Sequence, residues 1–194
     1  GRGYFCALAS DRGWQCQGID IAERLVQEGR ALFALDLRCV NIKDIKGGNE
    51  RFDVVTFWNV LEEVDDPVLV LEKCRSLLPP RGLLFIRTPN AVYHRCMARI
   101  VKVMNTFGLT MVTGRNAYIF HRFSFSAATI RRLLQKQGFT RIIVRNSCPT
   151  KGDPYQVGKG VGIIKMLVYG VAQVIYFLTF GKVCLSSSLE VYAE

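Results

Sequence analysis

The chain has 194 residues, of which 49% are hydrophobic, and carries a formal net charge of +10. This length suits one packed domain, and no linker-like stretch divides it, so a single domain over residues 1–194 is predicted. The positive charge favours anionic partners such as phosphorylated substrates, nucleic acid or an anionic membrane face, and it says nothing about the fold. Seven cysteines without a C-x-x-C spacing indicate reduced thiols in a cytoplasmic protein rather than a disulfide framework or a metal site.

The chain opens with Gly1-Arg2-Gly3, without an initiating Met or the basic-then-apolar run of a signal peptide. We therefore expect it to begin partway through a motif and to lack its true N-terminus.

Hydrophobic periodicity predicts an alternation of helices and short strands, which is typical of an α/β sandwich. Helices are expected over residues 4–12, 21–32, 66–78 and 126–138. Strands are expected over residues 14–20, 37–42, 52–58, 83–87, 140–145 and 188–192. The last two strands are predicted to form an antiparallel hairpin, with an apolar helical insertion at about 157–181 between them.

Local signals mark the ends of two of these helices. Asp66 is a good N-cap, and Pro67 follows at a position where its missing N–H costs nothing. Ser126 is a second N-cap, and Gly138 is the usual residue just past a helix end.

The opening glycines and Asp20 have the spacing of a nucleotide site. Gly1 and Gly3 lead into a helix, and Asp20 ends the next strand 19 positions after Gly1. Glycines let the backbone approach a ligand, a helix N-terminus presents amides, and an acid about 20 residues on can accept both ribose hydroxyls. Taken alone, this pattern also fits a tight turn and a surface aspartate.

Two longer runs in the middle of the chain narrow the interpretation. Residues 52–67, including Trp58-Asn59-Val60-Leu61-Glu62-Glu63, and residues 77–90 resemble the fourth-strand and fifth-strand signatures of class I S-adenosylmethionine-dependent methyltransferases. The turn Pro79-Pro80-Arg81-Gly82 keeps the final glycine of the family pattern and has Arg81 in place of the glycine before it. Residues 121–139 are similar to the helix that follows, and residues 146–155 to a segment of the broad bacterial branch.

The resemblance implies a Rossmann-like three-layer sandwich, a mostly parallel sheet with an antiparallel C-terminal hairpin, and S-adenosylmethionine as the cofactor. It also implies that the first strand, a central one in the family's sheet, is missing from this chain. Each buried backbone group left unpaired costs about 1 to 3 kcal/mol, so we expect the chain by itself to be unstable or inactive. Gly1 and Gly3 match the last two glycines of the cofactor loop, and Asp20 matches the acid that binds the ribose. The remaining implied contacts are Ile21 beside the adenine, Asp44 at the adenine amino group, Asn59 near the methionine part and Trp58 lining the same pocket.

A methyl transferase needs mainly to align the acceptor with the methyl group and to exclude water. If the acceptor is a hydroxyl, His121, His94 or Glu63 could take its proton. Glu63 stands where many relatives have histidine. A packed, purely structural histidine is the alternative reading of His121. The expected acceptor is small or lipid-linked. The lipid-linked alternative comes from the apolar run at residues 161–180, which lies where the resembled family places its substrate-recognition elements.

Two other classes of protein stay open. A catalytically silent Rossmann-like scaffold, binding or membrane-associated, would keep the fold without the reaction. An NAD-dependent dehydrogenase would share the glycine loop and the acid, but the third small residue of its fingerprint falls at Cys6. That class also has no counterpart to residues 52–67 and 77–90.

Basic and apolar segments follow in the second half of the chain. Arg95, Arg99 and Lys102 are spaced to share one helix face, which is either solvated or in contact with an anionic surface. Residues 161–180 form an apolar run flanked by lysines. Its uncharged part is about 22 Å long as a helix, short of the ~30 Å hydrocarbon core.

A spanning helix is therefore disfavoured for residues 161–180. Two functional alternatives are an interfacial helix at the inner face of a membrane and a lid that presents an apolar wall to a lipid-like substrate. A core helix inserted before the last strand is as well supported as those two together. Nucleic-acid binding is a minor option, because no recognised module accompanies the charge.

Overall fold

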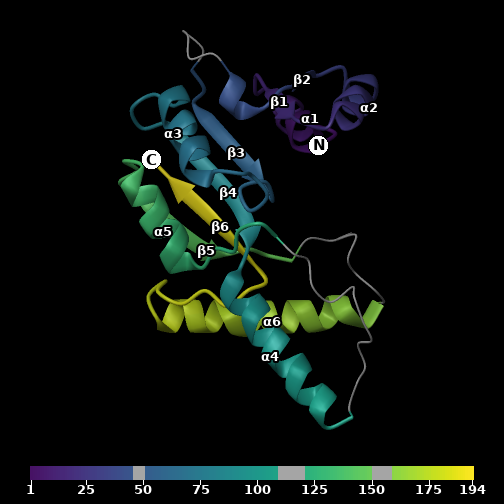
Figure 1. Ribbon diagram of the computed structural model, residues 1–194, viewed down its shortest axis with the longest axis vertical. Helices are drawn as coiled ribbons and strands as arrows, with labels where there is room; N and C mark the ends of the chain where they lie inside the picture. The colour runs from purple at the N-terminus through teal and green to yellow at the C-terminus, as the bar shows by residue number, and fades with distance from the viewer. Residues whose placement is uncertain (46–50, 109–120, 150–158) are drawn as a thin grey trace. The chain divides into compact units, whose positions relative to one another are not determined.

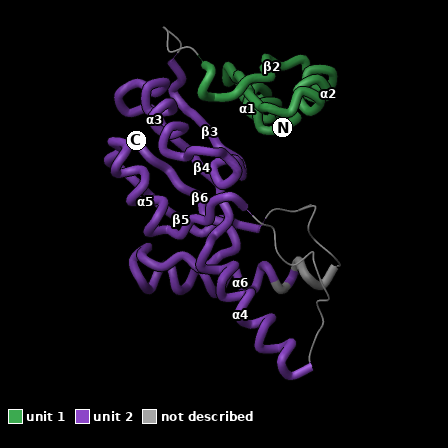
Figure 2. Tube along the Cα trace, viewed as in Figure 1, with its two compact units in different colours: residues 1–50 green, residues 51–194 purple. Residues whose placement is uncertain are grey.

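The computed structural model describes residues 1–45, 51–108, 121–149 and 159–194. The chain divides into two compact units, Gly1–Glu50 (unit 1) and Arg51–Glu194 (unit 2), which Figure 2 distinguishes by colour. The prediction of helices alternating with short strands is confirmed in both units.

Unit 1 is a small helix–strand repeat. Its described elements are α1 (Tyr4–Ser10), β1 (Gln17–Asp20), α2 (Glu23–Phe33), β2 (Asp36–Cys39) and the 3₁₀ turn η1 (Ile42–Asp44). β1 and β2 run parallel, so their carboxyl ends, at Asp20 and Cys39, lie together at one edge of this two-stranded sheet.

The packing of unit 1 converges on the side chain of Leu37, which is almost fully buried. A Cβ atom added at Gly3 would lie 2.9 Å from its methyl groups, and one added at Gly18 or Gly29 would lie 2.5 Å away. Real Cβ atoms do not approach carbon so closely, so these three glycines let the helices and β1 close around Leu37. The same Cβ position at Gly18 lies 3.2 Å from the Cys6 sulfur. The absence of a side chain at Gly18 thus leaves room for the Cys6 sulfur.

Unit 2 contains the larger sheet and most of the helices (Figure 1). Its described elements are β3 (Val54–Trp58), α3 (Pro67–Leu77), β4 (Leu83–Pro89), α4 (Ala91–Thr106), α5 (Ala127–Lys136), β5 (Ile142–Asn146), α6 (Lys159–Leu178) and β6 (Ser188–Ala193). The strand order is β3-β4-β6-β5. The core gathers apolar side chains of α3, α5 and the central strands, among them Leu71, Leu84, Ile86, Ile130 and Leu189.

The predicted antiparallel pairing of the last two strands is confirmed, and β6 has a second partner. β6 pairs antiparallel with β5 on one side and with β4 on the other, while β3 and β4 are parallel. The larger sheet is therefore mixed, with the antiparallel C-terminal strand that was predicted. The last strand fills the gap between β4 and β5, which satisfies the backbone groups of both.

The predicted helix caps are confirmed. The Asp66 carboxylate accepts from the amides of Val68 (2.9 Å) and Leu69 (3.1 Å). Ser126 and Thr129 form a reciprocal capping box. Gly138 follows α5 with a left-handed φ of 82°.

Several predicted boundaries were wrong by a few residues. β1 begins at Gln17 rather than at residue 14, because residues 11–13 form a turn that ends at Gly13, with φ 83°. α2 begins at Glu23, since the Ala22 amide is held by the Asp20 side chain. β2 ends at Cys39, β3 begins at Val54 and β5 at Ile142, since strand pairing starts and stops at those residues.

The turn before β4 explains the Arg81 substitution noted above. Arg81 has a left-handed φ of 69°, the conformation for which glycine is best suited. Gly82 has no left-handed φ, but a Cβ there would lie 2.7 Å from the Pro79 ring. The chain thus keeps the glycine that close packing requires and tolerates arginine at the strained position.

Two helices carry apolar surface that the sheet does not cover. α4 extends away from the sheet (Figure 1), and of its residues Ala91 alone is buried. α6, the predicted insertion, lies against β5, where the Asn146 amide donates to the Ala172 carbonyl (3.0 Å). Over the described ranges, no helix is long and apolar enough to cross a bilayer.

Candidate functional site

Asp20 lies at the carboxyl end of β1, where the sequence placed it. One of its carboxylate oxygens accepts from the Ala22 amide (2.8 Å), and the other accepts from the Gly1 amino group. Partial burial disfavours the charged form, but these hydrogen bonds outweigh it and lower the pKa of Asp20. Asp20 is therefore an ionised acceptor, which is the form that can bind a diol.

The glycine loop has the backbone geometry that the sequence implied. Gly3 is the N-cap of α1 with φ 76° and ψ 21°, and its carbonyl accepts from the Ala7 amide (2.9 Å). A left-handed residue at this point turns the chain into the helix. Gly1, Gly3 and Asp20 are thus brought together within unit 1.

The other two predicted residues of unit 1 are exposed. Ile21 directly follows Asp20 and is 74% exposed, so an apolar side chain stands beside the carboxylate. Asp44 ends the η1 turn, which Asn41 caps by accepting from the Lys43 amide (3.1 Å). The predicted adenine contacts of Ile21 and Asp44 stay predictions.

In unit 2, Trp58 and Asn59 lie at the carboxyl end of β3, as predicted. Asn59 has a left-handed φ of 54°, and its amide donates to the Arg87 carbonyl (2.9 Å), which turns the chain out of the strand. Trp58 is partly exposed, and its ring packs 4.9 Å from that of Phe85, which in turn contacts Tyr192. An aromatic wall therefore leads up to Asn59.

Arg87, in β4, is a residue to which the sequence assigned no role. Its guanidinium donates to the Ser147 hydroxyl (3.1 Å) and, at 3.4 Å, to the Asn59 side-chain oxygen. Ser147 in turn donates to Glu190 (3.0 Å). Arg87 therefore links the ends of β3 and β5 to β6. The sequence signal was one charge near the end of an otherwise apolar strand.

His121 and Glu63, named separately as candidate bases, form a pair. The Nδ1 atom of His121 is hydrogen bonded to the Glu63 carboxylate. The His121 side chain is largely enclosed, with 16% exposed, while that of Glu63 is half exposed. A carboxylate on Nδ1 orients the ring and leaves Nε2 as the nitrogen that can exchange a proton with an acceptor.

The segment after His121 is held against the loop that carries Glu63. The Phe123 amide donates to the Glu62 carbonyl (2.9 Å), and Arg122 forms an ion pair with Asp65. These contacts fix the position of the His121–Glu63 pair. His94, the third candidate base, lies in the first turn of α4, and its proposed role stays untested.

Glu62, also passed over by the sequence reading, is fully buried. One carboxyl oxygen accepts from the Thr88 hydroxyl (3.1 Å), and the other has no partner among the described residues. Burial raises the pKa of Glu62 above its ordinary value. Within the described ranges, no group of three or more His, Cys, Asp or Glu residues is arranged to hold a metal ion.

Comparison with known proteins gives a consistent result. The model of a family described as "Methyltransferase domain" matches residues 1–143. A ubiquinone biosynthesis O-methyltransferase from Bradyrhizobium diazoefficiens is 34% identical over 95 residues, which are 46% of this chain and 37% of that protein. The chain spans less than half the length of the curated relatives that it matches.

Solved structures show the same fold at low sequence identity. A SAM-dependent methyltransferase from Archaeoglobus fulgidus superposes with a TM-score of 0.62 and 15% identity over the whole of this chain and 81% of its own. The plantazolicin methyltransferase in complex with SAH gives 0.63 and 16%, over the whole of this chain and 72% of its own. The predicted Rossmann-like α/β fold class is confirmed, with a mixed sheet.

Proposed function

This chain belongs to the methyltransferase-domain family, and on that premise we propose that it transfers a methyl group from S-adenosylmethionine to a small or lipid-linked acceptor. The observation that carries the proposal is the ionised Asp20 at the end of β1, beside the left-handed Gly3 that opens α1. A carboxylate and exposed loop backbone at one edge of a parallel sheet suit an adenosine.

Each candidate residue then has a distinct task. Asp20 accepts both ribose hydroxyls, and the backbone at Gly1 and Gly3 lets the cofactor approach closely. Ile21 and Asp44 would contact the adenine, and Asn59 and Trp58 the methionine part. When bound, S-adenosylmethionine supplies a methyl group already activated on a sulfonium, so alignment and exclusion of water are the protein's main contribution.

The His121–Glu63 pair is proposed as the general base for a hydroxyl acceptor. His121 would take the acceptor proton on Nε2, while Glu63 holds the ring and stabilises the imidazolium. This assignment gives Glu63 a role although many relatives have histidine there. Base catalysis of this kind contributes roughly 10²-fold or more.

Calorimetric titration of the full-length protein with S-adenosylmethionine, S-adenosylhomocysteine and NAD tests the cofactor assignment. We expect binding of the first two, and a loss of roughly 10-fold or more in affinity for Asp20→Ala, because hydrogen bonds to a charged group contribute about 1.5 to 3 kcal/mol. Asp36→Ala is the matched control, since Asp36 is a carboxylate at the opposite end of the neighbouring strand β2. Equal loss in both variants, or binding of NAD alone, would contradict the proposal.

A second test, which measures the rate of methyl transfer, addresses the general base. His121→Gln and Glu63→Gln should each lower the rate constant of methyl transfer by roughly 10²-fold without weakening cofactor binding. Glu72→Gln, on the exposed face of α3, is the control. An unchanged rate in both variants would leave His121 as a packed structural residue.

One observation favours the alternative, a catalytically silent member of the family that serves as a scaffold. The chain departs from the family pattern at Glu63 and Arg81. Cofactor binding without turnover on any phenolic or lipid-linked acceptor would support that scaffold. A dehydrogenase is the weakest candidate, because the family match spans the loop, Asp20 and the β3–β4 region together.

The remaining expectations are also proposals. A single domain over residues 1–194, with the α6 helix as an insertion, is supported by one family model that matches parts of both units. A cytoplasmic protein that touches the inner face of a membrane through residues 161–180 is supported by the exposed apolar side chains of α6. Such a location would suit a lipid-linked acceptor.

A further inference from the structure

We propose that α6 and α4 together bind an anionic lipid bilayer. The apolar face of α6 enters the bilayer, and the basic side chains of α4 contact its anionic headgroups. The inference rests on the membrane contact in the proposed function and deepens it by naming the lipid chemistry. It is independent of whether the chain transfers methyl groups.

The outward face of α6 is apolar and continuous. Its exposed large side chains recur every three or four residues along the helix, so they share one stripe. They are Ile163, Met166, Leu167, Val171, Val174, Phe177 and Leu178, each more than half exposed. No charged residue interrupts this stripe, because the single charge of the helix after Lys159 is Lys165, which does not fall on it.

The opposite face of α6 is the one that the protein covers. Ala172 is buried, and its carbonyl accepts from Asn146 at the end of β5. Gln173 and Tyr169 are hydrogen bonded to each other (2.8 Å), and Asn146 also donates to Gln173 (3.1 Å). Tyr169 and Gln173 thus have hydrogen-bond partners on the inner side, and the apolar side chains are left outside. A face of this kind is a feature of helices that lie in a membrane interface.

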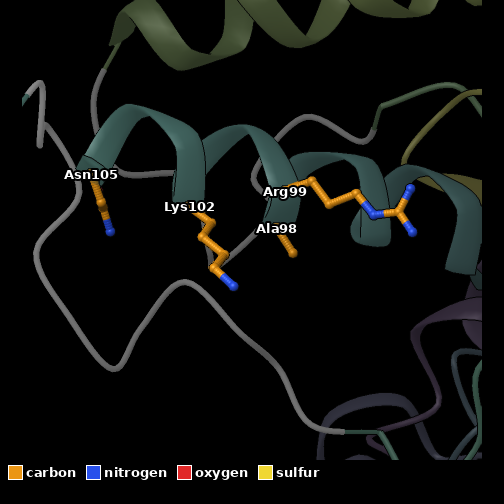
Figure 3. A pocket seen from close by; sticks show the side chains of 4 residues that line it. All are labelled: Ala98, Arg99, Lys102 and Asn105. Carbon is orange, nitrogen blue, oxygen red and sulfur yellow. The ribbon is translucent and has the colours of Figure 1, made fainter. Parts of the chain in front are cut away.

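α4 supplies the electrostatic part. Figure 3 shows Arg99 and Lys102 on this helix, beside Ala98 and Asn105, with which they line an open pocket. Ile100, Val103 and Met104 are exposed on the other side of the same helix, and Phe107, just past its end, is exposed as well. A basic polar face beside an apolar one is typical of helices that bind anionic lipid surfaces.

The charge of the whole second part of the chain matches this assignment. Residues 73–194 contain 18 Lys and Arg against three acidic residues, whereas residues 1–72 contain eight against 13. Neither α4 nor α6 contains an acidic residue. A surface this basic attracts the anionic lipids of an inner leaflet.

The same charge disfavours a second copy of the chain as the occupant. Two such faces brought together would place like charges opposite each other, which opposes association. A neutral bilayer would satisfy the apolar stripe of α6 but would leave the basic side chains of α4 without a partner. An anionic bilayer satisfies both helices.

Vesicle flotation of the full-length protein tests the proposal without any cofactor. We expect binding to vesicles of phosphatidylcholine with phosphatidylglycerol, weak binding to phosphatidylcholine alone, and release by high salt. Calorimetric binding of S-adenosylmethionine is measured on the same preparations. A failure of the membrane proposal, with cofactor binding intact, is thereby distinguished from a failure of the methyltransferase proposal.

Matched variants separate the contribution of the α6 apolar stripe to vesicle binding from a general effect of adding two negative charges. Leu167→Glu with Leu178→Glu should lower the partition coefficient at least about tenfold. Leu8→Glu with Leu32→Glu, at leucines of similar exposure on α1 and α2, should leave it unchanged.

A second matched pair isolates charge. Arg99→Gln with Lys102→Gln on α4 should lower the partition coefficient about 25-fold, since each basic residue near an anionic surface contributes about fivefold. Arg132→Gln with Lys136→Gln, both exposed on α5, should have a much smaller effect. Equal losses within either matched comparison, salt-insensitive binding to neutral vesicles, or self-association that the α6 variant abolishes would each overturn the proposal.

Discussion

Leu37 provides the sharpest test of how unit 1 holds its glycine loop. Alanine substitutions at three glycines separate two physical effects. Gly13→Ala introduces a Cβ at φ 83° in open space, so it reports backbone strain alone. Gly18→Ala introduces a Cβ 2.5 Å from Leu37 on a backbone that has no left-handed φ, so it reports crowding alone. Gly3→Ala combines a left-handed φ of 76° with a contact of 2.9 Å.

The expected magnitudes follow from these geometries. An alanine in the left-handed conformation destabilises the folded chain by roughly 1 to 2 kcal/mol. About 0.5 to 1 kcal/mol of stability is regained, because alanine lowers the conformational entropy of the unfolded chain. Gly13→Ala should therefore lower the free energy of unfolding by about 1 kcal/mol. Overpacking costs typically 1 to 3 kcal/mol, so Gly18→Ala should cost about 2 kcal/mol. Gly3→Ala should cost about 3 kcal/mol, close to the sum of the other two.

Urea denaturation measures the three free energies, and calorimetric titration measures S-adenosylmethionine affinity in parallel. Gly3→Ala should also weaken the cofactor, whereas Gly13→Ala should not. A double-mutant cycle with Leu37→Val completes the test, because a shorter side chain relieves the contact and should recover part of the cost at Gly18. If Gly3→Ala costs no more than Gly13→Ala, or if Leu37→Val recovers nothing, the packing argument is refuted.

Three further predictions concern unit 2. Burial raises the pKa of Glu62, so the fold loses stability as pH rises above the unfolded-state glutamate value of about 4.3. Glu62→Gln should therefore gain stability relative to wild type as pH rises above that value in urea melts, and a pH-independent difference would contradict this. Arg81→Gly should raise the melting temperature, because the roughly 1 to 2 kcal/mol of left-handed strain that it relieves exceeds the roughly 0.5 to 1 kcal/mol entropy cost of glycine. Arg132→Gly within α5 should lower the melting temperature. Arg87→Lys keeps the charge but cannot span Ser147 and Asn59, so it should cost about 1 kcal/mol in urea denaturation and weaken S-adenosylmethionine binding; unchanged affinity would show that Asn59 needs no such support.

Helix ends and the end of β1 could be predicted from the sequence. Asp66 with Pro67, Ser126 and Gly138 marked helix ends correctly, because caps involve residues within a single turn of chain. The position of Asp20 at the end of a strand was legible for the same reason, since it required only the apolar run before it. The strand limits were less accurate, because a strand ends where its partner ends, and the partner is distant in sequence.

For the candidate site, the sequence predicted single residues but not which of them contact each other. Residue types and spacing nominated Gly3, Asp20, Asn59 and His121 one at a time. Only the folded chain paired His121 with Glu63 across 58 positions and joined Arg87 to Ser147 across 60. The burial of Glu62 could not be predicted from the sequence either, because a carboxylate in a loop is normally expected to be solvated.

The sequence by itself determined where this protein turns, caps its helices and displays its apolar and basic residues, since those properties depend on neighbours along the chain. Tertiary structure alone decided that β6 lies between β4 and β5, that Leu37 needs three glycines around it, and that the apolar stripe of α6 faces outward. Each of these outcomes depends on contacts between segments far apart in sequence, and no local propensity encodes which segments meet.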